Sequence, residues 1–104
     1  MVLVSVMYPN EPGSSFNQDY YLQTHLPLVR SRWDPMGLED LRPVRGVGTA
    51  DGSPPPYQVM ALLTFRSMQD FQAAGKAHGQ EIFADIPNFT KAQAVVQINE
   101  PQAW

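Results

Sequence analysis

Of the two histidines in the chain, His25 is the one that falls on an apolar helix face. Successive helical residues are about 100° apart, and on that spacing His25 lies near the centre of an arc formed by Tyr21, Leu22, Leu26, Leu28, Val29 and Trp33. Residues four apart on a helix are neighbours, so Tyr21 can contact His25. Burial disfavours the charged imidazolium, so this ring should be neutral, with one donor and one acceptor nitrogen. Such a histidine is equipped for general acid–base catalysis.

A structural role for His25 is the alternative, and residue type alone favours it, because a catalytic signature needs more than one group. In that role the ring nitrogens would bond the carbonyl freed by Pro27 and one other group. His78 lies at the edge of an apolar stripe on the second predicted helix, where a histidine is usually structural or solvated. Asp85 falls in the last turn of that helix, where the helix dipole disfavours a carboxylate. A structural role, in which Asp85 accepts hydrogen bonds from the turn before Asn88, accounts for this position.

The sequence shows no motif for cysteine chemistry, metal binding or cofactor binding. The chain has no cysteine, which excludes disulfides, thiolate metal sites and a cysteine nucleophile. The two histidines lack metal-ligand spacing with each other and with carboxylates, so no metal site is predicted. There is no glycine-rich phosphate loop, serine elbow or dinucleotide fingerprint, and we therefore expect no cofactor.

Charge and hydropathy limit the possible partners. The formal net charge is −3, from seven Lys and Arg against ten Asp and Glu, and no run of either sign occurs. Nucleic acid is not an expected partner, because a basic footprint is missing. The apolar start of the chain ends at Tyr8 and has no basic flank, so it indicates a strand rather than a signal peptide or membrane span. We expect a cytoplasmic protein that does not contact membranes.

Four segments are typical of strands, at residues 2–8, 38–50, 57–65 and 91–99. Gly46 and Gly48 predict a bulge or a close backbone approach in the second of them. No repeat and no domain boundary is visible, so residues 1–104 are expected to form one domain.

Two helices are predicted between these strands. The first should begin at Ser15, which has capping-box spacing to Gln18, and run toward Trp33. Pro27 lies inside it and should cause a kink or break. The second should begin at Ser67 and end near residue 85, because the proline at position 87 disfavours helix before it.

The resulting order βαββαβ predicts an α+β fold of the ferredoxin-like type, with a four-stranded antiparallel sheet and both helices on one face. The first and third strands are apolar on both sides. An antiparallel sheet with one face in water should alternate more cleanly, and two helices cannot cover both faces. We therefore predict a homodimer in which a second copy of the sheet covers the free face.

Three segments resemble the EthD family, which is named after a component of ethyl tert-butyl ether degradation. They are FNQDYYLQTHLPL at residues 16–28, DIPNFT at residues 85–90 and VQI at residues 96–98. The Tyr-Tyr-x-x-x-His-x-Pro-Leu pattern in the first is fairly specific, and the resemblance extends from Tyr8 to Asn99. It implies a dimeric α+β barrel, in which two sheets pack against each other with the helices outside. Similar barrels include cofactor-independent monooxygenases, polyketide cyclases, muconolactone-type isomerases and heme-degrading enzymes.

The resemblance implies a pocket role for the family's histidine, here His25, and for the preceding Tyr21. We predict these two as catalytic residues acting on a small hydrophobic carbonyl or phenolic compound between the first helix and the sheet. Predicted substrate contacts are Trp33, Leu22, Val29 and Phe65.

Three hypotheses about function follow. The first is a cofactor-independent enzyme of the isomerase, cyclase or monooxygenase type, in a catabolic, xenobiotic-degrading or secondary-metabolic pathway. The second is a non-catalytic accessory protein that binds a hydrophobic metabolite for a partner oxygenase system. The third is a purely structural dimer, with no pocket near His25.

Overall fold

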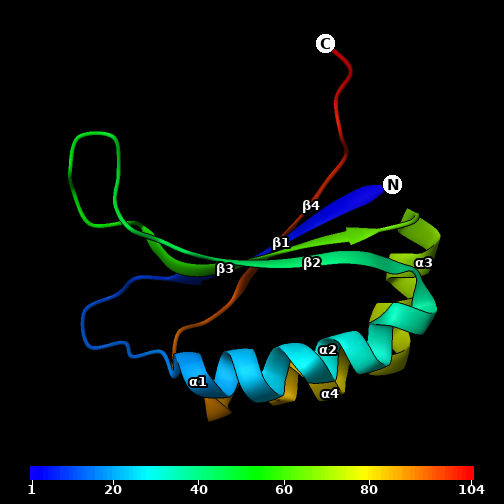
Figure 1. Ribbon diagram of the computed structural model, residues 1–104, viewed down its shortest axis with the longest axis horizontal. Helices are drawn as coiled ribbons and strands as arrows, with labels where there is room; N and C mark the ends of the chain where they lie inside the picture. Colours follow the sequence, from blue (N-terminus) through cyan, green and yellow to red (C-terminus); the bar gives the residue numbers. More distant parts are fainter.

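The computed structural model describes all residues from 1 to 104 (Figure 1). Its four strands are β1 (Val2–Pro9), β2 (Leu38–Arg45), β3 (Tyr57–Phe65) and β4 (Val95–Asn99). The first helical segment consists of α1 (Gln18–Tyr20), η1 (Tyr21–His25), α2 (Leu26–Trp33) and η2 (Asp34–Met36). The second consists of α3 (Met68–Ala74), η3 (Gly75–Gly79), α4 (Gln80–Ala84) and η4 (Ile86–Asn88).

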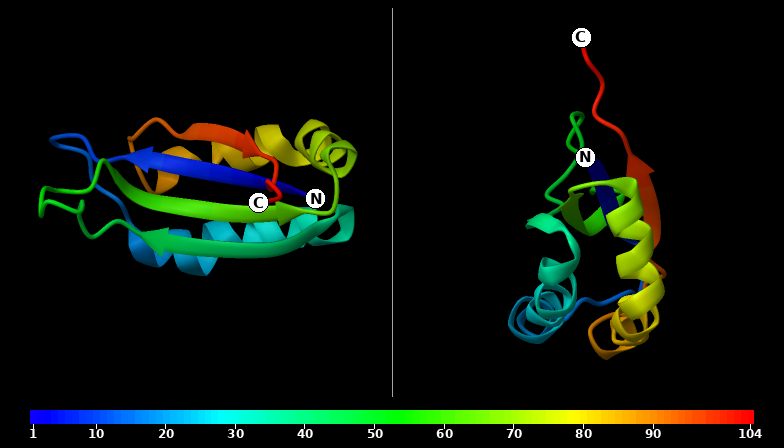
Figure 2. Two further views of the ribbon diagram at one scale, coloured as in Figure 1. Left: turned by 90° about the horizontal axis from the view of Figure 1, so that it is seen from above. Right: turned by 90° about the vertical axis from the view of Figure 1, so that its right-hand side faces the viewer.

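The strands form one sheet in the order β2-β3-β1-β4, and every neighbouring pair is antiparallel. Both helical segments pack on the same face of this sheet, side by side (Figure 2). This arrangement confirms the predicted ferredoxin-like α+β fold. No helix is both long enough and apolar enough to cross a membrane.

The first helical segment starts two residues later than its capping-box pattern predicts. Asn17, not Ser15, caps the helix, and its side chain accepts a hydrogen bond from the Tyr20 amide at 3.1 Å. The prediction for Ser15 was wrong because its carbonyl accepts a bond from the Thr90 hydroxyl, and Phe16 pairs with Thr90 in an isolated bridge. These contacts hold the chain extended up to the cap.

Of the two outcomes expected at Pro27, a kink or a break, the break does not occur, and the helix is irregular instead. The turn before it, η1, is a π-helix in which the Leu26 amide bonds the Tyr21 carbonyl five residues earlier. Because proline removes an amide donor and needs space near the preceding turn, one widened turn lets the helix continue through it. From this turn onward, buried side chains recur every four positions, at Tyr21, His25, Val29 and Trp33, and Leu26 is buried beside them.

The second helical segment follows its prediction closely. Ser67 caps α3, and its hydroxyl accepts a hydrogen bond from the Asp70 amide at 3.1 Å. A second π-helical stretch, η3, interrupts the segment, and α4 ends at Ala84 with Asp85 as its C-cap residue.

Two strands are shorter than expected. β2 ends at Arg45. The next residue, Gly46, lies so close to the start of β3 that an added Cβ would be 2.1 Å from the Tyr57 carbonyl oxygen. Of the two predicted readings of this glycine, a close backbone approach is the one found. β4 begins at Val95 instead of residue 91, because the preceding residues bond locally, with the Ala92 amide donating to the Thr90 hydroxyl.

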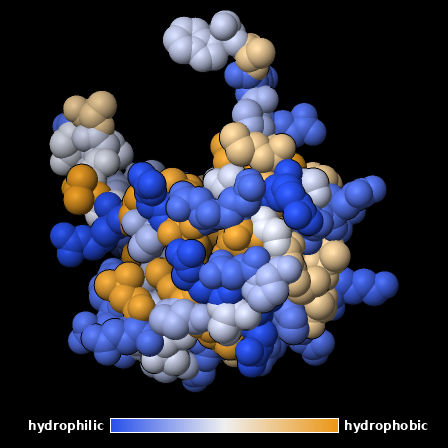
Figure 3. Space-filling model, turned by 45° about the vertical axis from the view of Figure 1, so that its right-hand side comes forward, coloured by the Kyte–Doolittle hydropathy of each residue, from blue (hydrophilic) through white to orange (hydrophobic).

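The two faces of the sheet differ in how far they are covered. The side chains of β1 and β3 that face the helices are almost all buried. The opposite face, called the open face below, leaves Val44, Leu62 and Val95 between 37% and 44% exposed. Apolar side chains also reach the surface in patches between polar ones elsewhere (Figure 3).

Candidate active site

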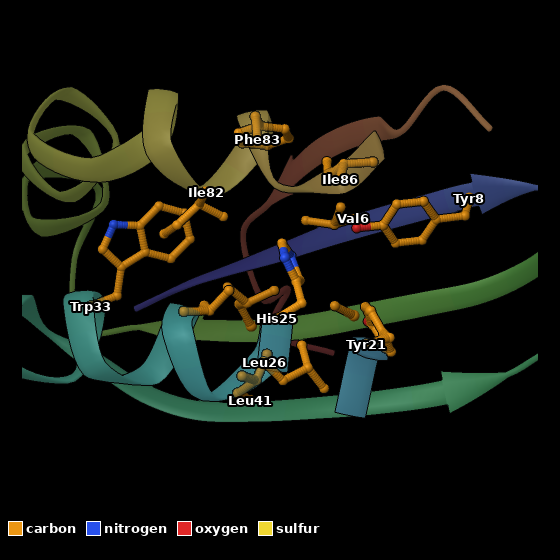
Figure 4. A pocket seen from close by; sticks show the side chains of 13 residues that line it. Val6, Tyr8, Tyr21, His25, Leu26, Trp33, Leu41, Ile82, Phe83 and Ile86 are labelled. Carbon is orange, nitrogen blue, oxygen red and sulfur yellow. The ribbon is translucent and has the colours of Figure 1, made fainter. Parts of the chain in front are cut away.

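A small apolar cavity lies between the sheet and the two helical segments (Figure 4). Its volume is about 30 Å³, and 12 of its 13 lining residues are hydrophobic. The remaining one is His25. A space of this size has room for about two water molecules, so a larger ligand needs adjoining space or movement of side chains.

His25 reaches the cavity from the widened turn η1. Its residue is 3% exposed, and its ring contacts the Phe89 ring at a centroid distance of 4.6 Å. The Tyr21 ring lies nearly parallel to the imidazole, at 5.9 Å and an angle of 15°. Aromatic rings therefore fix the plane of the imidazole, as the four-residue spacing of Tyr21 and His25 predicts.

A carboxylate holds the outer nitrogen of this ring. Nδ1 of His25 lies 2.9 Å from Oδ2 of Asp85, which follows α4 sixty residues later in the chain. The other oxygen, Oδ1, accepts hydrogen bonds from the Tyr20 hydroxyl at 2.7 Å and the Asn88 side-chain amide at 2.9 Å.

These bonds decide the charge on Asp85. Burial by itself would raise the pKa of Asp85, but the hydrogen bonds from Tyr20, His25 and Asn88 together hold it below its usual value. The group is a carboxylate at neutral pH and can only accept hydrogen bonds. The proton of the shared bond is therefore carried by Nδ1 of His25.

The second nitrogen of His25 is left free. Burial lowers the pKa of His25, and the opposing effect of Asp85 does not fully offset it. The ring is neutral at pH 7, with a proton on Nδ1 and a lone pair on Nε2. No group of the protein bonds Nε2. The Tyr21 hydroxyl is the one side-chain N or O atom that is both fully buried and without a partner, so the unbonded Nε2 must be accessible. The site thus presents a base to the cavity.

Two tyrosine hydroxyls accompany this base. The Tyr21 hydroxyl is fully buried and makes no hydrogen bond. Tyr8, on β1, is 1% exposed, also makes no side-chain hydrogen bond, and points its hydroxyl toward His25 in Figure 4. Burial raises the pKa of both tyrosines, so each stays protonated. The Tyr8 hydroxyl can donate to a ligand oxygen, whereas the Tyr21 hydroxyl is enclosed by the packing around it.

The predicted substrate contacts separate into two groups. Val29 and Trp33 line the cavity, and Trp33 also donates from Nε1 to the Ala74 carbonyl at 2.9 Å. Leu22 does not line it: one residue after Tyr21, it is rotated off the buried stripe and is 49% exposed. Phe65 is fully buried beyond the cavity, with its ring 5.6 Å from that of Trp33.

Three residues of the site escaped the sequence reasoning, namely Asp85, Tyr20 and Tyr8. The unfavourable position of Asp85 at a helix end was the available signal, and the expected bond with the Asn88 turn exists. The bond to His25 has no local signature, because the two residues are far apart in sequence. His78 lies apart from the cavity, with a third of its side chain exposed, 4.0 Å from Glu81. The structure contains no group of three or more His, Cys, Asp or Glu side chains placed to share a metal ion.

Comparisons with known proteins agree on one family. The family model described as EthD domain matches residues 14–93. The crystal structure of an EthD-like protein from Ralstonia eutropha superposes with a TM-score of 0.87 at 35% identity, covering 95% of this chain and 89% of that one. An EthD family protein from Bacillus halodurans gives a TM-score of 0.69 at 22% identity, covering 98% of this chain and 99% of that one.

A more distant structure shares the fold alone. It is a dimeric ferredoxin-like protein from an uncultured marine organism, with a TM-score of 0.57 at 11% identity over 100% of this chain and 97% of that one. No curated protein matches the chain significantly.

The unpartnered Tyr21 hydroxyl leads to a prediction about stability. An unsatisfied buried hydroxyl costs roughly 1–3 kcal/mol, so Tyr21→Phe should raise the free energy of unfolding by about 1 kcal/mol. Urea denaturation at pH 7 measures this. A decrease of more than about 0.5 kcal/mol would show that the hydroxyl has a stabilising partner after all.

The lowered pKa of His25 makes stability depend on pH. Below about pH 6.5 the unfolded chain binds a proton at this residue more readily than the folded one, so the free energy of unfolding should fall as pH drops from 7 toward 5. The slope can reach at most about 1.4 kcal/mol per pH unit. The lowered pKa of Asp85 affects the free energy of unfolding in a separate pH range, near pH 4 and below.

His25→Asn keeps an amide donor near Asp85 and removes this titration. Urea unfolding between pH 5 and 7 should therefore give a flatter curve for the variant than for the wild type. Parallel curves for the two proteins would contradict the assignment of His25 as a neutral buried ring.

Proposed function

The chain belongs to the EthD family, and from this premise we propose that it is a homodimeric enzyme that uses His25 as a general base on a small hydrophobic carbonyl or phenolic compound. The observation that carries the proposal is the free Nε2 lone pair facing an apolar cavity while Asp85 holds the proton on Nδ1.

The geometry supplies each part of a proton abstraction. Nε2 of His25 takes a proton from a carbon or oxygen of the ligand, and the imidazolium that forms is stabilised by the Asp85 carboxylate on its other side. The Tyr8 hydroxyl can donate to the ligand oxygen, where negative charge develops as the proton leaves. The apolar lining keeps water away and strengthens these interactions.

Reactions that begin with such a proton abstraction suit this site. Enolisation, isomerisation and cyclisation need only the base and the hydroxyl donor. A monooxygenase-type reaction would start from the same carbanion and would take dioxygen as a further reactant. A catabolic or secondary-metabolic pathway in the cytoplasm stays the predicted setting.

A non-catalytic accessory role is the second candidate. The unpartnered Tyr8 hydroxyl favours it, because it could hold a ligand oxygen without any proton transfer. Binding and proton abstraction are separated by a variant that removes Nε2 alone.

His25→Asn is that variant, and a ketone is a suitable probe because its α-protons exchange with D₂O only when they are abstracted. We expect the wild type to accelerate deuterium incorporation into 2-butanone, followed by proton NMR. The variant should lose this acceleration by about 10²–10⁴-fold while still binding the ketone. His78→Asn serves as the matched control and should exchange like the wild type. Exchange that is equally fast in the His25 variant, or absent from the wild type, would exclude a general base at this position.

The proposed dimer forms through the open face. Val44, Leu62 and Val95 leave apolar surface there, which a second copy of the sheet would cover. The fold is shared with a protein described as dimeric, which supports the same assembly here.

A charge placed on the open face should separate the two copies. We expect Leu62→Lys to elute as a monomer in size-exclusion chromatography with light scattering, because a lysine on a packed sheet would be desolvated without a partner. Val47→Lys is the control, since Val47 is 87% exposed in the loop between β2 and β3. A wild-type monomer, or an unchanged dimer in the Leu62 variant, would overturn the proposed interface.

A further inference from the structure

We propose that the ligand is longer than the cavity beside His25, and that its apolar tail lies in a second chamber kept open by Gly75 and Gly79. This inference rests on the proposed function and adds which residues set the length of the ligand.

The second chamber adjoins the first. Its volume is about 70 Å³, and it lies between the sheet and the second helical segment. Val6, Trp33, Leu63 and Phe83 line both spaces, so these four side chains form the boundary between them.

The two glycines have no structural reason to be glycine. Gly75 has φ −63° and Gly79 has φ −58°, which are ordinary right-handed helical values. A Cβ added at either position would meet no atom within 4 Å. Alanine is the better helix former, so glycine here weakens the helix without easing any contact. Both residues line the second chamber, and their missing side chains enlarge it.

The polar groups lie at the other end of the joined space. In Figure 4 Tyr8 and Trp33 stand at opposite ends of the first cavity, with His25 between them. The unpartnered hydroxyl of Tyr8 and the free Nε2 of His25 lie toward the Tyr8 end. A ligand oxygen is thus held at that end, and the rest of the molecule extends past Trp33 toward the glycines.

The lining also fixes the chemical class of the ligand. Neither space is lined by a side chain that is charged at neutral pH. An ionic ligand would lose its hydration without gaining a partner, which excludes carboxylates and amines. The joined site therefore takes an uncharged ketone or phenol that carries an apolar tail.

A pair of methyl ketones tests this arrangement. The carbonyl group of either ketone would lie near His25. 2-Heptanone carries three more methylene groups than 2-butanone, and these need the second chamber. Calorimetric or NMR titration of the wild type should show tighter binding of 2-heptanone. Gly75→Ala and Gly79→Ala should each weaken the binding of 2-heptanone by about three- to tenfold, which is equivalent to losing one or two buried methylene groups. The affinity for 2-butanone should stay unchanged.

Stability provides a second readout for the same variants. Because an added methyl group meets open space, each alanine should raise the melting temperature by about 4–8 °C. Lys76→Ala, on an exposed position of the same turn, is the control and should alter neither ketone's affinity. Weaker binding in a variant that is more stable cannot come from damage to the fold.

The outcomes separate this inference from the proposed function. If both glycine variants bind 2-heptanone as tightly as the wild type, or if either is destabilised, the proposal that the ligand tail occupies the second chamber is wrong. If the affinity depends on the length of the ketone but no deuterium exchange is found, the proposal of a second chamber is supported and the proposal of a general base at His25 is wrong. If the wild type binds neither ketone, both are overturned.

Discussion

The hydrogen bond between His25 and Asp85 is the contact on which the site depends. It joins the widened turn of the first helical segment to the end of the second, across sixty residues of sequence. Without the carboxylate, a buried imidazole would have no fixed tautomer, and its basic nitrogen could face either way. Asp85 is in turn held by Tyr20 and Asn88, so three residues from both segments fix one ring nitrogen of His25. The two helical segments are therefore tied together by the group that would do the chemistry.

The widened turn η1 is what lets His25 take part. A proline two residues after the histidine would be expected to disturb the helix, yet the π-helical turn absorbs it and leaves the segment continuous. The same turn brings Tyr21, His25, Val29 and Trp33 into one buried stripe over the sheet. A π-helical turn also occurs in the second segment, at the two glycines, so each helix changes its pitch where it lines empty space.

Sequence patterns predicted the fold well, because the signals for it are local. The strand–helix order, the Ser67 cap and the end of the second helix depend on residues close together in the chain. The burial of His25 and its contact with Tyr21 follow from helical periodicity, and the structure confirms both. The cap expected at Ser15 was wrong because contacts with Thr90 outweighed the local pattern. At Pro27 a change of helix type took the place of a break.

The remainder of the site could not be predicted in this way. The partnership of His25 with Asp85 depends on how two distant helices pack, and no spacing in the sequence encodes it. Tyr8 appeared as one more apolar strand residue, because nothing in its neighbours shows that its hydroxyl lacks a partner. A void is harder still to foresee, since it is defined by atoms that are missing. Gly75 and Gly79 acquire meaning only when the space beside them is known.

The placement of Asp85 between interior and surface has a consequence for turnover. The His25 side chain is 4% exposed and that of Asp85 is 14% exposed, so the pair spans the wall of the site from the enclosed side to the wet side. Because Nδ1 keeps its proton on the carboxylate, a proton received at Nε2 has to leave again from Nε2, by return to another atom of the ligand. The positive charge that the ring would carry in between is stabilised from the wet side, by a carboxylate that need not enter the apolar space.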